Sequence, residues 1–492
     1  MDELGALSSV VLAALVGFAF FRLVKDYGRS SVRHAPLPPS GYGLPLIGDT
    51  FRFISEGGTS GRRHHERLGD IYRTWFLGER VVHIGDLASA KKILNAEHEL
   101  VEGQWPWVIR ELLGPRSIST TYGQYHTQLR KVLNPHFTPK AVAAYTTRLV
   151  ELAQQTCDEM ADAAKPKGED AMKKFTFKVA TEMILGFEPS ATSDDRVARL
   201  QSRFNDWVEG LLSLPINLPG FTFHKAMQAR KVILAEYHDN ITRLVKRASA
   251  DEATSILELY VRAVMSSDEF DKDVFDTEHF ANSALNLLFA GHDTSASVLM
   301  MLLRFLKLSP KTLGKLREEQ SKVMAEHGKE IDNDAVASMP YAEATVKEAM
   351  RIEPIVSVLS RVALKTFEVG GYTIPKGQKI QIELWKIFEE DPRWIKADNP
   401  ELAPTNFNPD RWLSEEGRRT GSFIPFGSGS RMCTGYNFAM LEIKVMLAVL
   451  AREYEWEIDL NEPVKTFPLP VLAWGMPMTF KRLQRPVTAS EE

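Results

Sequence analysis

Cysteine is scarce in this chain, which has only Cys157 and Cys433 among its 492 residues. So few cysteines exclude a small secreted fold held by disulfides, and they place the bulk of the chain on a reducing, cytosolic side. Charge of one sign is also scarce, because the formal net charge is only −4 and no run of lysine or arginine occurs. This balance argues against a nucleic-acid partner. Internal repeats and low-complexity tracts are absent from the sequence. The composition is that of an ordinary globular protein, and the length alone permits two to four domains.

Charged residues are missing altogether from Leu4 to Phe21, a run of 18 residues. As a helix it would be about 27 Å long, close to the thickness of one hydrocarbon core. A cleaved signal peptide is the first alternative, but Asp2 and Glu3 precede the run and no small-x-small site follows it. A buried helix of a globular domain is the second. Basic residues after the run predict a single-pass membrane anchor with the rest of the chain in the cytosol: Arg22, Lys25, Arg29 and Arg33.

Local patterns then predict the order of the elements. The proline-rich segment 35–45 should be stiff and extended. Alternating residues over 71–85 suggest a hairpin around Gly78, and residues 140–355 should be mostly helical. Further elements are expected as follows: a long helix over Thr277–Lys307, a helix over Tyr341–Glu353, a hairpin of Val358–Val369 with Tyr372–Ile382, a helix over Tyr436–Tyr454, and a disordered tail at Thr488–Glu492.

The two cysteines have different surroundings. Cys157 lies on an apolar helical face and is interpreted as a small core residue. Cys433 lies among glycines in the stretch Phe423–Gly435, directly before a predicted helix. Glycines let the backbone approach a flat cofactor closely, and a helix N-terminus with loop N–H groups stabilises a thiolate and lowers its pKa. This pattern favours a metal ligand over a buried structural cysteine.

The same stretch resembles the haem-binding signature of the cytochrome P-450 family, F-x-x-G-x-R-x-C-x-G. Its fixed positions are filled here by Phe426, Gly429, Arg431, Cys433 and Gly435. The resemblance implies a mainly α fold with a small β-rich lobe and a haem b whose axial ligand is the Cys433 thiolate. It also places Phe426, Arg431 and Gly435 against the cofactor. A thiolate ligand favours cleavage of the O–O bond.

Ala290-Gly291-His292-Asp293-Thr294-Ser295 resembles the oxygen-activation motif of this family's long central helix. The resemblance implies that Thr294 and Asp293 are catalytic, with Thr294 passing protons that Asp293 resupplies. Thr294 can also bond back along its own helix and loosen it. Ala290 and Gly291 are expected against the cofactor, with Gly291 leaving room for the porphyrin. A helix kink without chemistry is the alternative.

Further family motifs supply buried and cofactor-binding cations. Glu348 and Arg351 fill E-x-x-R and share one helix face, and Arg411 lies in the segment that supplies a second arginine. The resemblance implies that these three form a buried ionic cluster with a structural role. Four more residues are expected at the haem, mainly with its propionates: His126, Arg130, Arg361 and Arg431.

The resemblance implies a monooxygenase that inserts one oxygen atom of O₂ into a small hydrophobic substrate. Electrons would come from an NADPH-dependent flavoprotein reductase, docked where Arg130, Lys131 and Lys140 add positive charge. The overall pattern is most similar to the branch acting on sterols, retinoids, carotenoids and other terpenoids. A fatty-acid hydroxylase, a haem-thiolate isomerase or dehydratase that does not use O₂, and a haem sensor are alternatives. The expected pocket residues are Trp105, Trp107, Leu287, Ala290, Ile355, Val358 and Leu472.

These patterns together divide the chain into four segments. They are an anchor helix over residues 1–24, a basic and proline-rich hinge over 25–48, a monooxygenase domain over 49–487 and a tail over 488–492.

Overall fold

The computed structural model describes residues 35–41, 48–50, 52, 61–76, 78–188, 194–247, 255–270, 275–391, 403, 405–418, 423–466 and 469–484. The chain forms two compact units. Unit 1 comprises residues 1–102 and 358–383, and unit 2 comprises residues 103–357 and 384–492. The expected anchor over Leu4–Phe21 and the tail over Thr488–Glu492 lie outside the described residues. Within the described ranges, no helix combines the length and apolar character that crossing a membrane requires.

Unit 1 is built on a five-stranded sheet with the strand order β1-β2-β7-β4-β3. The predicted hairpin around Gly78 is present as β1 (Ile71–Phe76) and β2 (Glu79–Ile84) in antiparallel register. The other elements of this unit are α3 (Arg62–Leu68), α4 (Leu87–Asn95), β3 (Val101–Gly103), β4 (Val358–Ala363), β5 (Phe367–Val369), β6 (Tyr372–Ile374) and β7 (Lys379–Glu383).

The second predicted hairpin, over residues 358–382, is interrupted. Instead of two long strands, β4 pairs with β7 and β5 pairs with β6. Pro375 has no N–H to give to a ladder, and Gly377 has a positive φ of 79°. The break therefore follows from residues that a continuous strand does not tolerate.

The proline-rich segment is extended, as predicted, where residues 35–41 are described. Its backbone bonds to neighbouring strands, since Arg73 N–H donates to Pro39 O and Thr373 N–H donates to Pro36 O, each at 2.9 Å. This part of the segment is therefore attached to the sheet of unit 1 and is not a free spacer.

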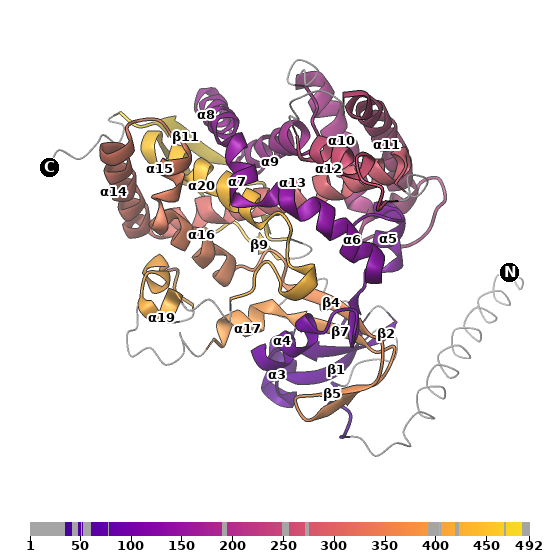
Figure 1. Cartoon of the computed structure of the whole chain (residues 1–492). Coiled ribbons are helices and arrows are strands. Elements are labelled where there is room, and N and C mark those ends of the chain that lie inside the picture. Colours follow the sequence, from indigo (N-terminus) through magenta and orange to yellow (C-terminus); the bar gives the residue numbers. More distant parts are fainter. Residues whose placement is uncertain are drawn as a thin grey trace, which may run out of the picture. The chain divides into compact units, whose positions relative to one another are not determined.

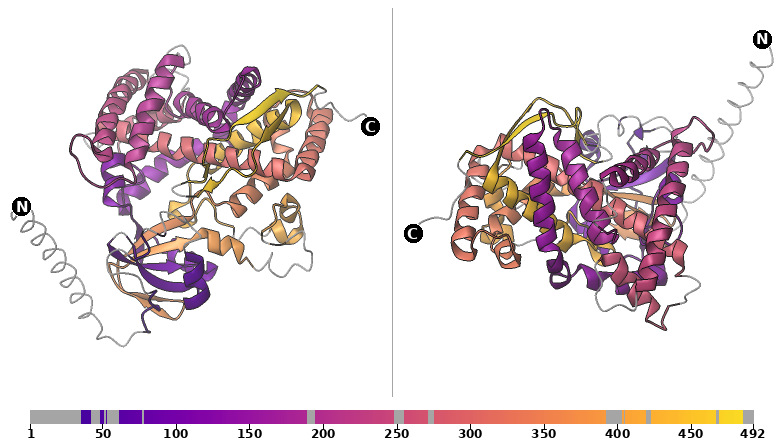
Figure 2. Two further views of the ribbon diagram at one scale, coloured as in Figure 1. Left: turned by 180° about the vertical axis from the view of Figure 1, so that it is seen from behind. Right: turned by 90° about the horizontal axis from the view of Figure 1, so that it is seen from above.

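Unit 2 is mainly helical, which confirms the predicted fold class. Its helices are α5 (Trp107–Leu113), α6 (Gly123–Leu133), α7 (Pro139–Val142), α8 (Thr146–Asp162), α9 (Gly168–Val179), α10 (Asp194–Gly210), α11 (Thr222–Arg247), α12 (Ile256–Met265), α13 (Thr277–Leu308), α14 (Pro310–His327), α15 (Asn333–Ala337), α16 (Pro340–Ile352), α17 (Leu384–Glu389), α19 (Glu415–Arg418) and α20 (Tyr436–Glu453). Short strand pairs join β8 (Tyr454–Ile458) to β11 (Met478–Arg482) and β9 (Val464–Lys465) to β10 (Val471–Leu472). Helices α10 and α11 lie side by side in all views (Figures 1 and 2).

Helix α13 is the central element of unit 2 (Figure 1). It begins after Asp276, whose carboxylate accepts a hydrogen bond from His279 N–H at 2.7 Å, and it ends before Pro310. At about 1.5 Å per residue its 32 residues span about 48 Å. Almost every residue from His279 to Leu303 is buried, because other helices pack around it.

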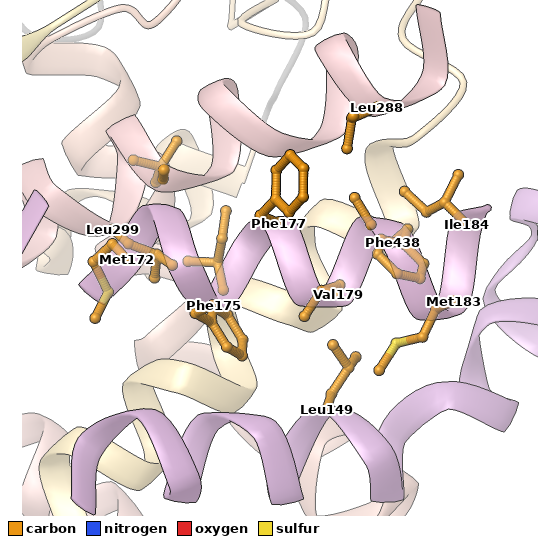
Figure 3. Packing of buried hydrophobic residues seen from close by; sticks show 14 of the residues in the cluster. Leu149, Met172, Phe175, Phe177, Val179, Met183, Ile184, Leu288, Leu299 and Phe438 are labelled. Atoms are coloured by element: carbon orange, nitrogen blue, oxygen red, sulfur yellow. The ribbon is translucent and has the colours of Figure 1, made fainter. Parts of the chain in front are cut away.

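The core between α8, α9, α13 and α20 is apolar and closely packed (Figure 3). Leu149 of α8, Phe175 and Val179 of α9, and Leu299 of α13 are wholly or almost wholly buried there. Side chains of this size each contribute about 1.5–3 kcal/mol when buried. This packing holds the middle of α13 in a fixed place.

Candidate active site

The loop before α20 positions Cys433. Gly427 and Gly429 adopt positive φ angles of 75° and 71°, which glycine allows without strain. The loop is closed by Cys433 N–H, which donates to Phe426 O at 2.8 Å. The Phe426 ring packs edge-on against Tyr436, the first residue of α20, with ring centroids 4.8 Å apart. The cysteine is therefore held rigidly at the entry to the helix.

The electrostatics of Cys433 correct one prediction. The side chain is accessible to solvent, yet protein atoms surround it closely enough that burial raises the pKa of the thiol. Gly435 N–H and the Arg130 guanidinium act in the opposite direction but do not outweigh burial. The prediction that the pKa of this thiol is lowered is therefore wrong. The Gly435 N–H and the charge of Arg130 both favour the thiolate, and a coordinated metal ion would deprotonate the thiol.

The motif on α13 lies where the burial of this helix is interrupted. Ala290 is exposed, and Gly291, Asp293 and Thr294 are partly accessible, although the flanking residues are buried. Thr294 Oγ1 donates a hydrogen bond to Ala290 O at 2.6 Å, which is the bond back along the helix that the sequence suggested. Burial raises the pKa of Asp293 to about 6. An acid of this pKa can both hold and release a proton near neutral pH.

Gly291 has a packing role of its own. A Cβ at this position would approach Ile184 Cδ1 to 3.2 Å. Ile184 ends the π-helical segment Ala180–Ile184 that follows α9. The glycine therefore allows this segment to pack closely on α13, and the structure attributes its small size to that contact.

Ser295 and Glu442 join α13 to α20. The Ser295 side chain bonds to the carboxyl of Glu442, which lies two to three turns after Cys433 on α20. Burial raises the pKa of Glu442 to about 8. The sequence interpretation missed Glu442, although an acidic residue between Leu441 and Ile443 in an apolar helix is a usable signal. This buried contact joins the cysteine helix to α13 directly after Thr294.

Two of the predicted cofactor-binding cations lie close to the cysteine loop. Arg130 of α6 donates from Nη1 to Thr434 Oγ1. Arg431 donates from Nη2 to Thr121 O at 2.6 Å, and its guanidinium lies 5.1 Å from the centre of the Tyr122 ring. Burial lowers the pKa of Arg130, and a guanidinium keeps its charge in proteins.

The other two predicted residues have different settings. His126 is buried on α6, one turn before Arg130. Arg361 belongs to β4 of unit 1, where its Nε lies 2.8 Å from Glu97 Oε2 in a buried ion pair. Glu97 therefore already neutralises Arg361, and a role at a propionate stays a prediction for this residue.

Glu348, Arg351 and Arg411 meet in one buried cluster. Glu348 accepts hydrogen bonds from Arg351 Nε and Nη2, both at 2.9 Å, and from Arg411 Nε at 2.8 Å. The Glu348 carboxylate accepts two further hydrogen bonds, from Trp412 Nε1 and Asn408 N–H, each at 2.9 Å. Trp412 was not predicted, but it follows Arg411 directly. Every oxygen of this buried carboxylate is thus satisfied, as a buried charge requires.

The predicted pocket residues are scattered. Trp105 and Trp107 are 37% and 51% exposed on unit 2, and Trp107 packs against Phe223. Leu287, Ile355 and Leu472 are buried in unit 2, whereas Val358 belongs to β4 of unit 1. Leu287 lines a small cavity whose other walls are Ile118, Leu129, Leu133, Tyr260 and Ser283. The lining of a substrate pocket therefore stays a prediction.

The described residues of unit 2 fit a haem. They offer a thiol donor on a glycine-rich loop, the accessible part of α13 around Ala290 and Thr294, and two arginines beside the loop for carboxylate groups. Accessible side chains in the middle of an otherwise buried helix indicate a face that a flat ligand can cover. The soft thiolate donor suits iron.

Comparison with known proteins gives a consistent result. The model of the cytochrome P450 family matches residues 38–480. Cytochrome P450 26A1 of Danio rerio is 31% identical over 482 residues, with 94% of each chain covered. The putative cytochrome P450 120 of Synechocystis is 27% identical, covering 87% of this chain and 93% of the relative. A solved structure, retinoic acid bound cyanobacterial CYP120A1, has a TM-score of 0.80 at 25% identity and covers 91% of this chain and 100% of its own.

Proposed function

Because the chain belongs to the cytochrome P450 family of haem-thiolate monooxygenases, we propose that Cys433 holds the haem iron and that Thr294 and Asp293 manage the protons of the reaction. The observation that carries this proposal is Cys433, accessible in an ordered loop, with Gly435 N–H bonded to its sulfur and the positive charge of Arg130 nearby. Phe426, Gly435, Ala290 and Gly291 would lie against the haem, and its propionates would be held by His126, Arg130, Arg431 and Arg361.

The overall reaction is that of a monooxygenase: R–H, O₂, two electrons and two protons give R–OH and water. When bound, the haem with its thiolate ligand supplies the activation of O₂. A hydrophobic substrate, O₂ and a redox partner that delivers electrons are the reactants of this family. The chain's own residues hold the cofactor, exclude water and deliver the protons.

Proton delivery would use two neighbouring groups on α13. Asp293 can take up and release a proton near neutral pH, since burial raises the pKa of its carboxyl to about 6. Thr294 Oγ1, which donates to Ala290 O at 2.6 Å, can rotate its proton away and take a new one from the acid side. The hydroxyl thus passes a proton toward the accessible face of the helix.

Replacing Thr294 with alanine is expected to keep the haem but to uncouple electron use from product. The hydroxyl contributes no packing in the core, because Thr294 is partly accessible. We expect product per NADPH to fall by about 100-fold, at the low end of what a positioned proton-transfer group contributes. The Thr294→Ser variant keeps the hydroxyl and should stay close to wild type. Equal product per NADPH in the alanine variant and the wild type would refute the role of Thr294.

For the substrate we propose a terpenoid of the retinoid type. The solved structure that matches over its full length has retinoic acid bound. The exposed Trp105 and Trp107 and the buried Leu287, Ile355 and Leu472 supply apolar surface near the predicted recognition segments. Sterols and carotenoids share this apolar chemistry, and fatty-acid hydroxylation is the alternative.

A spectral titration distinguishes these substrates. Displacement of a water ligand by a bound substrate shifts the haem Soret band, so each compound can be tested at equilibrium. Retinoic acid is expected to give a saturable shift at lower concentration than a long-chain fatty acid or a sterol. A shift with the fatty acid alone would instead support the hydroxylase of the alternative class.

For location we propose the four-segment organisation with residues 1–24 as the anchor, 25–48 as the hinge, 49–487 as the catalytic domain and 488–492 as the tail. The uncharged run over Leu4–Phe21 and the basic residues after it support a single span in the endoplasmic reticulum membrane. An NADPH-dependent flavoprotein reductase would dock at the exposed Lys131 and Lys140, beside Arg130. Release of the protein from membranes after deletion of residues 1–24, with haem retained, is the test.

A further inference from the structure

His292 lies within the motif on α13, but the proposed mechanism gives it no role. Its side chain is completely buried, whereas its neighbours Gly291 and Asp293 are partly accessible. Two phenylalanine rings contact it edge-on: Phe177 of α9 at 5.1 Å and Phe204 of α10 at 5.5 Å between ring centroids. Phe177 points from α9 toward α13 in Figure 3. A histidine in an apolar setting needs a reason, because an alanine or leucine would cost less to bury there.

The polar contacts of His292 indicate which ring nitrogen carries the proton. Nδ1 lies 2.8 Å from the Thr176 hydroxyl of α9. That hydroxyl has one proton, which it donates along its own helix to Met172 O at 3.1 Å. With its proton used in that bond, Thr176 accepts from His292, and we assign the hydrogen of the ring to Nδ1. In the neutral ring Nε2 is then left with a lone pair.

Nε2 faces the acid of the proposed relay. It lies 3.7 Å from Asp293 Oδ1 and has no hydrogen-bond partner within the described ranges. A small rotation of the Asp293 carboxyl about its side-chain bonds brings the two atoms within hydrogen-bond range. A lone pair on the imidazole suits a protonated carboxyl, which can donate to it.

The charges around the pair are consistent with this assignment. Burial lowers the pKa of His292 to about 3, so the ring is neutral at physiological pH. Burial raises the pKa of Asp293 to about 6. The charged groups that face the pair are Lys173 and Glu169 of α9, which bind each other at 2.7 Å. Their opposite charges largely cancel, so the neutral contact between His292 and Asp293 decides the orientation of the carboxyl.

We propose that His292 is a positioning residue, fixed by Thr176, whose Nε2 orients the carboxyl of Asp293 so that its proton is held for delivery to Thr294. The inference rests on the proposed role of Asp293 and adds a buried residue that orients its carboxyl. The chemistry needs a neutral acceptor at this point. A cation would repel the proton that Asp293 must hold, and an apolar side chain would leave the carboxyl free to rotate.

Infrared spectroscopy of the holoenzyme tests this contact directly. The spectra are taken below pH 6, where the Asp293 carboxyl is mostly protonated, and its C=O stretch is identified as the band that the Asp293→Asn variant loses. In His292→Phe, which keeps a ring of similar shape among Phe177 and Phe204, the band is expected to move toward the higher wavenumber of an acid without a hydrogen bond. Thr176→Val should shift it in the same direction by less, because it frees the ring without removing Nε2.

The matched control is His279→Phe. His279 is a second completely buried histidine of α13, about 20 Å along the helix from His292, and its ring contacts Tyr125 and Tyr260. This variant should lose stability but leave the Asp293 band in place. An Asp293 band in His292→Phe at the wild-type position overturns the inference.

Catalysis provides the second measurement. Product per NADPH should fall by about tenfold in His292→Phe, as expected from a misplaced proton donor, while the carbon-monoxide spectrum of the reduced protein stays intact. Asp293→Asn separates the two proposals. If Asp293→Asn leaves the coupling unchanged, the relay itself is wrong. If Asp293→Asn uncouples the enzyme and His292→Phe does not, only the role of His292 is wrong.

Discussion

Replacing Cys433 with alanine is expected to abolish monooxygenase activity while the helical circular dichroism spectrum stays unchanged. The thiol is accessible, so its removal leaves no cavity in the core. The loop keeps its main-chain closure, since Cys433 N–H and Phe426 O do not depend on the side chain. Only the proposed bond from sulfur to iron is lost, and with it the thiolate that favours O–O cleavage. Product formation under saturating substrate and reductase is the measurement.

Cys157 provides a control, because its replacement is expected to lower stability and to leave activity unchanged. It is completely buried, its Sγ lies 3.8 Å from Met446 Sδ, and burial raises the pKa of its thiol. The Cys157→Ala variant should lose about 1 kcal/mol of unfolding free energy but keep its activity. Activity that survives in Cys433→Ala, or activity that disappears in Cys157→Ala, would show that the two cysteines have been assigned wrongly.

Replacing Glu348 with alanine is expected to cost about 3–5 kcal/mol of unfolding free energy and most of the bound haem. The change leaves Arg351 and Arg411 buried without their counter-charge, although each also donates to Asn406 O at 3.1 Å. Trp412 Nε1 loses its acceptor as well. Chemical denaturation and the ratio of haem to protein after purification measure the two losses.

Glu343→Ala on the same helix is the matched control for this prediction. Glu343 also binds a cation on α16, with its Oε1 2.6 Å from Lys347 Nζ, but its side chain is 39% exposed. An exposed pair of this kind contributes about 0–1 kcal/mol. If both variants lose equal stability, burial is not what makes the Glu348 cluster essential.

Much of the fold could be predicted from the sequence, because the relevant signals are local. The start of α13 follows from the capping residue Asp276 and its end from Pro310. The hairpin around Gly78 follows from alternation and a turn residue. The pairing of β5 with β6 across Gly370 and Gly371 is part of the predicted second hairpin, whereas the break that separates this pair from β4 and β7 was not predicted.

The candidate site shows the same division. Cys433, Thr294 and Glu348 lie in motifs whose spacing is visible along the chain. The bond between Ser295 and Glu442, the contact of Thr176 with His292 and the pairing of Arg361 with Glu97 link residues far apart in sequence. The pKa of Cys433 was expected to be lowered by the helix N-terminus. Burial reversed it, and burial is a property of the packed protein rather than of the loop sequence.

The carbon-monoxide difference spectrum of the reduced protein tests the central claim most directly. Thiolate ligation moves the Soret band of this complex to a longer wavelength than a neutral nitrogen ligand gives. We expect the intact, folded protein to show the thiolate band, and the Cys433→Ala variant to lack it while Cys157→Ala retains it. A Soret band without the thiolate signature in the intact protein, or a thiolate band that persists in Cys433→Ala, would contradict the assignment of Cys433 as the iron ligand.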